Sequence, residues 1–304
     1  MTHQNKTAPG QWETVLVPMR DGRTTEVLTY GRGTDGTLVF HSGTPGGLAP
    51  RDYFAEVCDK HGLRFVMAAR PGYGLSSPRP GRVAADVAED IADVLDHVGV
   101  DTFISMGCSG GGCHTLACAA LLPGRCLASA AVVSPAPIDA DDLDYYAGMG
   151  AENVEEWKLA EQGREAVEPW LERAAAGMRN QPIDNFAEQY GDSFPTVDIE
   201  MMATGFGTTM QASMQKAIST GVEGWLEDDL VLVTPWGFDL GAITTPVSVW
   251  AGKQDRMVSS DHSVWIARAI PGADLHVLAD HGHLSVQVAA LDDIVGDLVR
   301  KSAS

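Results

Sequence analysis

The chain has 304 residues, 44% of them hydrophobic and 20% charged, and this length can bury a large core in one or two domains. Its formal net charge of -20 argues against nucleic acid and anionic membranes as partners, because both would repel it. It lacks an apolar run long enough for a transmembrane helix, and its polar start lacks the apolar core of a signal peptide. We therefore expect the protein in the cytoplasm.

Short apolar runs alternate with helical patterns along the chain. The first two runs, at 13–19 and 24–31, indicate a hairpin with its turn at Arg20–Arg23. In chain order, the pattern then predicts strands at 37–41, 63–69, 101–107, 126–135, 245–252 and 274–280, and helices at 50–61, 82–98, 110–122, 260–269 and 288–301.

Strand–helix alternation predicts an α/β fold with a mostly parallel central sheet flanked by helices, and the opening hairpin adds an antiparallel edge. The alternation stops between about residues 136 and 240, where the patterns are helical only. We expect a core domain made of 1–135 and 241–304, with a helical cap, or lid, inserted at 136–240. Both ends of this segment join strands, so packing over the sheet explains it better than an independent domain.

The acidic charge is concentrated in one stretch. Residues 141–200 hold 15 Asp and Glu against four Lys and Arg. A solvated helical surface is the simpler explanation, and an acidic rim that discourages anionic substrates is the alternative.

Five cysteines lie at positions 58, 108, 113, 118 and 126, without a CxxC pair. The odd number and the spacing argue against a disulfide framework and against a zinc site, so we expect small buried apolar residues. No cluster of residues suggests a metal or an organic cofactor, and we expect neither.

The pentapeptide 107–111, GCSGG, fits G-x-S-x-G and lies between a predicted strand and a predicted helix. This is the context of a nucleophile elbow, a tight, strained turn that exposes the hydroxyl of Ser109 at the end of the strand. A glycine-rich turn without catalytic function is the simpler alternative. Phosphate binding is disfavoured, because the segment has neither the Walker Lys nor the dinucleotide-binding spacing.

Two later loops contain candidate partners for Ser109. His283 follows the last predicted strand and is the candidate general base, with His281 as its competitor. Asp255 follows the preceding strand and is the candidate that orients the imidazole, although turns often contain Asp, and Asp261 is the alternative. The order Ser, Asp, His along the chain is the one expected after a nucleophile elbow.

The loop 41–47, HSGTPGG, follows a predicted central strand, where a backbone N–H can face a developing oxyanion. The N–H of Gly110, directly after the elbow serine, would be the second donor. Such donors contribute about 2.7–4 kcal/mol each in comparable sites. An ordinary turn is the simpler alternative.

Together these motifs resemble those of the α/β-hydrolase family, and the resemblance covers nearly the whole chain. HSGTPGG is similar to the oxyanion loop, ARPGYGLSS to the D-x-P-G-x-G-x-S segment, GCSGGG to the elbow, AGKQD to the acid loop and HGH to the base loop. The resemblance implies that Ser109 is the nucleophile, His283 the base and Asp255 its orienting partner, with Thr44 and Gly110 as oxyanion donors.

Three residues depart from the family's usual pattern. Ser42 stands where the family often has His, and Arg70 and Cys108 are also unusual at their positions. Ser42 leaves open which backbone N–H of its loop is the oxyanion donor, and Arg70 alters the loop near the pocket mouth. None of the three belongs to the predicted catalytic triad of Ser109, His283 and Asp255.

The inserted segment is rich in Met and aromatic residues, which suit an irregular apolar pocket, although packing of the cap onto the sheet is the simpler explanation for any one of them. The candidate pocket residues are Gly43, Cys108, Met202, Phe206, Met210 and Trp236.

The sequence thus predicts a serine hydrolase that forms an acyl-enzyme with a small, largely apolar carbonyl substrate such as a carboxylic ester. A C–C bond hydrolase, a lyase or a cofactor-free perhydrolase on the same fold is one alternative, and a non-catalytic ligand-binding protein is another. Serine at the nucleophile position argues against epoxide hydrolysis and dehalogenation. The expected partner is a small molecule, and the oligomeric state, a homo-oligomer included, stays open.

Overall fold

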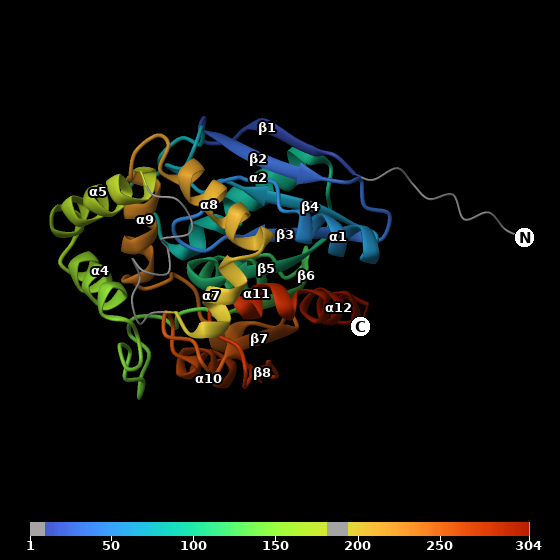
Figure 1. Ribbon diagram of the computed structural model, residues 1–304. Coiled ribbons are helices and arrows are strands. Elements are labelled where there is room, and N and C mark those ends of the chain that lie inside the picture. Colours follow the sequence, from blue (N-terminus) through green and yellow to red (C-terminus); the bar gives the residue numbers. More distant parts are fainter. Residues whose placement is uncertain (1–9, 181–193, 304) are drawn as a thin grey trace, which may run out of the picture.

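The computed structural model describes residues 10–180 and 194–303, so the polar start of the chain, residues 1–9, lies outside the described part. Eight strands form one sheet in the order β1-β2-β4-β3-β5-β6-β7-β8, flanked by helices (Figure 1). Among the described helices, none is both long enough and apolar enough to cross a membrane.

The elements follow the predicted alternation closely. The strands are β1 (Trp12–Pro18), β2 (Thr24–Tyr30), β3 (Gly36–His41), β4 (Leu63–Ala68), β5 (Phe103–Cys108), β6 (Cys126–Val132), β7 (Val247–Gly252) and β8 (Asp274–Leu278). The helices that pack on the sheet are α1 (Asp52–His61), α2 (Val87–Val98), α3 (Gly112–Leu121), α10 (Ser260–Ala269), α11 (Ser285–Ala289) and α12 (Leu291–Ser302).

The sheet combines an antiparallel edge with a parallel centre, as the sequence predicts. β1 pairs with β2 and β2 with β4 in antiparallel fashion, whereas all pairs from β4–β3 to β7–β8 are parallel. Every residue of β5 is buried, which is expected of a central parallel strand covered on both faces. The carboxyl ends of the parallel strands therefore share one edge, where the loops after β3, β5, β7 and β8 meet.

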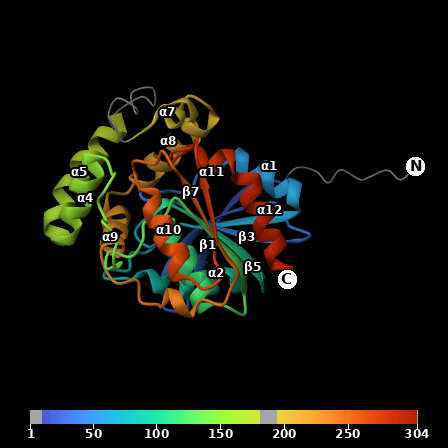
Figure 2. The same cartoon turned by 90° about the horizontal axis from the view of Figure 1, so that it is seen from below.

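Helices cover both faces of this sheet. α1 and α12 pack on one face with a core that includes Phe54, Phe65 and Leu298, and α2, α3 and α10 pack on the other with Ile91, Leu116 and Ile266. Figure 2 shows the two layers on opposite sides of the strands. The sequence did not predict α11, because a helix of five residues is too short for a periodic apolar pattern.

The described part of the segment 136–240 is helical. It contains α4 (Ala151–Glu161), α5 (Arg164–Asn180), α7 (Thr196–Met202), α8 (Gly205–Ala217) and α9 (Glu223–Leu232), followed by a short 3₁₀ turn at Leu240–Ala242. α4, α5 and α9 contact one another at one end of the molecule, and α7 contacts both α8 and α11 (Figure 1). The chain leaves the sheet after β6 and returns to it at β7, so this segment is inserted between two neighbouring strands.

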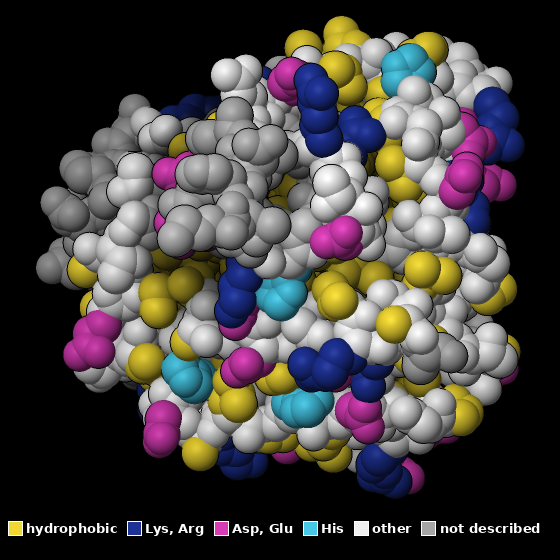
Figure 3. Space-filling model, turned by 90° about the vertical axis from the view of Figure 1, so that its right-hand side faces the viewer, with side chains coloured by type: hydrophobic (Ala, Val, Ile, Leu, Met, Phe, Trp, Pro, Cys, Tyr) yellow, Lys and Arg dark blue, Asp and Glu magenta, His cyan; other side chains and the backbone are white. Residues whose placement is uncertain are grey.

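The surface carries charges of both signs. On the face shown in Figure 3, Lys and Arg side chains lie beside Asp and Glu, and apolar side chains are interspersed among them. Not all of the acidic stretch 141–200 is solvated, however. Glu156 and Asp198 are buried, which corrects the expectation of a purely solvated surface for these two residues.

Candidate active site

Ser109 occupies a strained turn directly after β5. Its φ angle is 52°, in the left-handed region that residues other than glycine rarely adopt. The turn is so tight that a Cβ atom at Gly107 would lie 2.2 Å from the carbonyl oxygen of Gly111. A Cβ at Gly111 would lie equally close to the carbonyl oxygen of His41. The glycines of GCSGG are thus required by close backbone approach, and the geometry is that of a nucleophile elbow.

His283 and Asp255 form a buried hydrogen-bonded pair. The Nδ1 atom of His283 lies 2.8 Å from Oδ2 of Asp255, and their side chains are 5% and 1% exposed. The other oxygen of Asp255 accepts hydrogen bonds from the N–H groups of Met257 and Val258, at 2.8 and 2.9 Å. Both carboxylate oxygens are therefore engaged, and the imidazole is held with Nε2 as its available nitrogen.

The alternatives to these two residues lie elsewhere. Asp261 is exposed in the first turn of α10. His281 contributes its carbonyl oxygen to a hydrogen bond from Gln254 N–H and is not among the described residues that line the cavity beside Ser109.

The pKa of His283 lies above its ordinary value because of neighbouring carboxylates. Burial by itself lowers this pKa, but the charge of Asp255 and its hydrogen bond, with a smaller contribution from Asp198, outweigh that effect. These carboxylates favour the imidazolium, the form that results when a histidine accepts a proton.

Asp198, which the sequence did not single out, holds the loop around His283. It lies on α7 in the inserted segment, is completely buried, and accepts hydrogen bonds from the N–H groups of His283 and Ser285 at 2.7 and 2.8 Å. No local motif marks it, because it is one of 15 acidic residues in a single stretch.

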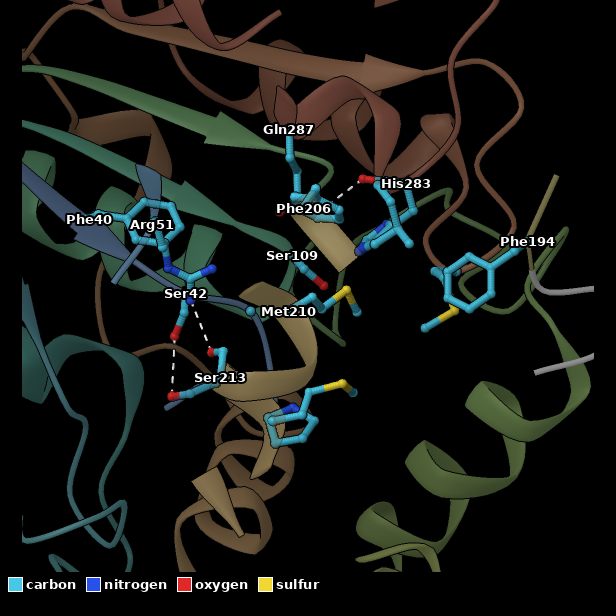
Figure 4. A pocket seen from close by; sticks show the side chains of 16 residues that line it. Phe40, Ser42, Arg51, Ser109, Phe194, Phe206, Met210, Ser213, His283 and Gln287 are labelled. Atoms are coloured by element: carbon cyan, nitrogen blue, oxygen red, sulfur yellow. Dashed lines mark hydrogen bonds between the residues drawn. The ribbon is translucent and has the colours of Figure 1, made fainter. Parts of the chain in front are cut away.

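Ser109 and His283 line one cavity of about 700 Å³, its open mouth included. Figure 4 shows Ser109 between Arg51 on one side and His283 and Phe194 on the other. The large apolar lining residues are Phe40, Phe194, Phe206, Met210, Met214, Met257 and Leu284. Among the hydrogen bonds of the described residues, none joins Ser109 Oγ to His283 Nε2, and in enzymes such contacts often tighten only when substrate binds.

Of the candidate pocket residues, Gly43, Phe206 and Met210 line this cavity, whereas Cys108, Met202 and Trp236 do not. Cys108 is buried in the core on one face of the sheet, since side chains alternate along a strand. Met202 packs behind the lining against residues such as Phe206, and Trp236 stacks on Phe238 beside a different hollow. The composition of the inserted segment indicated an apolar pocket but could not select its members.

Thr44 and Gly110 lie against each other beside the elbow. A Cβ atom at Gly110 would lie 2.5 Å from Oγ1 of Thr44, so only glycine fits without movement. The Thr44 N–H has no hydrogen-bond acceptor within residues 10–180 and 194–303. Neither Thr44 nor Gly110 is among the described residues that line the cavity beside Ser109, so their role as oxyanion donors stays a prediction.

A buried ion pair between Arg70 and Asp228 holds the loop 41–47 in place. Arg70 donates to the carbonyl oxygens of Ser42 and Gly43 at 2.8 and 3.0 Å, and its Nε donates to Asp228 at 2.9 Å. Asp228, on α9, also accepts from the hydroxyl of Thr44 at 2.9 Å. The network therefore joins the loop 41–47 to a helix of the inserted segment.

Asp228 is ionised in spite of its burial. Burial raises its pKa, but the charges of Arg70 and Arg82 outweigh this effect and bring the pKa below its ordinary value. The Tyr73 hydroxyl is a further donor to the carboxylate, at 2.8 Å. Arg70, noted in the sequence only as a departure, is thus neutralised and fixed in place.

Comparison with known proteins agrees with this geometry. A model of the alpha/beta hydrolase fold family matches residues 36–289. The chain belongs to this family. A curated relative of this alpha/beta hydrolase, the uncharacterized hydrolase YcgS of Bacillus subtilis strain 168, is 25% identical over 269 residues and covers 87% of this chain and 89% of its own length.

Solved structures share the fold across different reactions. An esterase from Thermogutta terrifontis is 20% identical with a TM-score of 0.66, covering 96% of this chain and 100% of its own. An epoxide hydrolase from Vigna radiata is 17% identical with a TM-score of 0.69, covering 96% and 98%. Because one alpha/beta hydrolase fold serves both, the reaction must be argued from the site. Among the described residues of this alpha/beta hydrolase, no group of three His, Cys, Asp or Glu could hold a metal ion.

Proposed function

We propose that this protein is a serine hydrolase that cleaves a carboxylic ester, or a related carbonyl compound, through Ser109, His283 and Asp255. The observation that carries the proposal is one cavity that contains both a serine in a strained elbow and a histidine paired with a buried carboxylate. A glycine-rich turn without catalytic function needs neither the strain nor the Asp–His pair.

In the proposed mechanism, Ser109 Oγ attacks the carbonyl carbon while His283 Nε2 accepts the hydroxyl proton. The backbone N–H groups of Thr44 and Gly110 stabilise the oxyanion of the tetrahedral intermediate. His283 then returns the proton to the departing alcohol, which leaves an acyl-Ser109 ester. Water repeats the sequence on this ester and releases the acid, with His283 again as base and then acid.

The inserted segment 136–240 is proposed to act as the cap of this site. It contributes Phe194, Phe206 and Met210 to the cavity wall, so it would set the size of the acyl or alcohol group that fits. The same segment supplies Asp198 and Asp228 to the loops of the base and of the oxyanion hole.

The test is hydrolysis of p-nitrophenyl esters of graded acyl length, together with labelling by a fluorophosphonate probe. We expect Ser109→Ala to lose labelling and at least about 10⁴-fold in kcat, because the acyl-enzyme can no longer form. Ser219→Ala is a matched control, since Ser219 is exposed and bonds only to Lys216 O. Labelling that persists in Ser109→Ala would refute the nucleophile, and labelling without ester turnover would move the proposal to C–C bond hydrolysis.

A further inference from the structure

Arg51 is a buried arginine in the wall of the cavity that contains Ser109. It follows Pro50 at the start of α1, where its carbonyl oxygen accepts from the N–H groups of Phe54 and Ala55, and its side chain turns inward. The residue is only 7% exposed. In Figure 4 its guanidinium lies on one side of Ser109.

The described residues of the cavity wall carry no charge opposite to that of Arg51. Among the described residues that line it, Arg51 is the one permanently charged side chain, and none is Asp or Glu. This is unexpected in a chain whose net charge is -20, because acidic residues outnumber basic ones almost twofold. The described lining of the cavity is thus cationic in a chain that is acidic as a whole.

Among the described residues, Arg51 donates hydrogen bonds to neutral groups only. Nη1 donates to the hydroxyl of Tyr53 and Nη2 to that of Ser213, both at 3.0 Å, and the guanidinium lies 5.4 Å from the ring centre of Phe40. These bonds use two of its five N–H donors, and the Nε–H is buried without any partner. Three donors thus have no acceptor in the described protein.

The other two buried arginines, Arg70 and Arg82, have a carboxylate counter-ion that Arg51 lacks among the described residues. Arg70 and Arg82 both pair with the carboxylate of Asp228, whereas no carboxylate of the described residues lies within 4.0 Å of Arg51. A buried guanidinium without a counter-ion is unfavourable, and its planar fork matches a carboxylate through two parallel hydrogen bonds.

We infer that the substrate carries an ionised carboxylate that pairs with Arg51 while its reacting carbonyl lies at Ser109. The substrate class is therefore a half-ester, or a related carbonyl compound, with a second acid group. This inference rests on the proposed hydrolase function and deepens it. An anionic substrate is the opposite of what the alternative interpretation of residues 141–200, an acidic rim that discourages anions, would predict.

The kinetic test compares two esters with the same five-carbon acyl chain: the mono-p-nitrophenyl ester of glutaric acid and p-nitrophenyl valerate. We expect the wild type to prefer the charged ester in kcat/KM, and Arg51→Met to lower the charged-to-neutral ratio about tenfold or more. Arg51→Lys should restore part of the ratio, since it keeps the charge but loses the fork. Arg173→Met is the control, because Arg173 is exposed on α5.

A binding test separates this inference from the proposed chemistry. Titration calorimetry of succinate, glutarate and adipate against Ser109→Ala, with and without Arg51→Met, needs no turnover. Arg51-dependent binding to Ser109→Ala, combined with a wild-type protein that neither hydrolyses esters nor labels with fluorophosphonate, would support the carboxylate site and sink the hydrolase proposal. Ester turnover without a charged-ester preference, or equal losses on both esters in Arg51→Met, would overturn the carboxylate site alone. Absence of Arg51-dependent dicarboxylate binding would also overturn it.

Discussion

Arg70 and Arg51 are both almost completely buried, yet their surroundings differ in kind. Arg70 pairs with Asp228 and donates to the carbonyl oxygens of Ser42 and Gly43, so its charge is neutralised within the protein. Within residues 10–180 and 194–303, the polar and aromatic partners of the Arg51 guanidinium are two hydroxyl groups and a phenyl ring, and Arg51 lines the cavity. The comparison teaches that burial alone does not assign a role to a charge, because its counter-ion decides whether it is structural or available to a ligand.

The largest effect on stability is expected when Asp228, the counter-ion of Arg70, is removed. Asp228→Ala leaves Arg70 and Arg82 buried without a carboxylate and should lower the free energy of unfolding by about 3–5 kcal/mol. Urea denaturation measures this change. Glu172→Ala, an exposed acid on α5, should change stability by less than about 0.5 kcal/mol. A loss of similar size in both variants would mean that the buried network is not what stabilises this region.

Removal of Arg51, which lines the cavity, should have a much smaller effect on the unfolding free energy. Arg51→Met removes a buried charge with no carboxylate partner in the part of the chain that the structure describes, so the unfolding free energy should stay within about 1 kcal/mol of the wild type or rise. Arg70→Met should instead be destabilising by several kcal/mol, since it leaves Asp228 with less compensation. Equal and large losses in the two variants would erase the distinction and make Arg51 a structural residue.

The smallest expected effect is a shift of the pH profile of activity when Asp198 is changed. The carboxylate of Asp198 accepts a hydrogen bond from the backbone N–H of His283. The proposed hydrolysis requires neutral His283 as the base, so kcat/KM should rise with pH through a midpoint above the ordinary 6.5 or so, because the pKa of His283 is raised. Asp198→Asn removes one of the causes and should move this midpoint to lower pH, by less than about one unit. Glu200→Gln, an exposed change on the same helix, should leave the profile in place. An upward shift in Asp198→Asn would contradict the assigned electrostatics.

Much of the fold could be predicted because its signals are local. The period of the apolar residues indicated the strands, and the match of GCSGG to a strand–helix boundary located the elbow before any contact was known. Asp255 and His283 were predicted from their places after the last two strands, and they form a hydrogen bond 28 residues apart in sequence. Their catalytic role stays a prediction.

The supporting residues could not be predicted in the same way. Asp198 and Asp228 come from the inserted segment and meet loops 85 and 184 residues away, and neither belongs to a local motif. Cys108, Met202 and Trp236 had suitable chemistry for a pocket, but side-chain direction and packing depth kept them out of the lining.

By itself, the sequence determined the α/β architecture, the antiparallel edge, the insertion between two strands and the loops that hold Ser109, Asp255 and His283. These depend on periodicity, glycine placement and chain order, which neighbouring residues specify. Only the tertiary structure decided which carboxylates neutralise which arginines, and hence that Arg70 is paired while Arg51 has no carboxylate partner among the described residues. Ion pairing in the interior depends on distances between segments far apart in the chain, because a low-dielectric interior makes each such contact strong and each missing one costly.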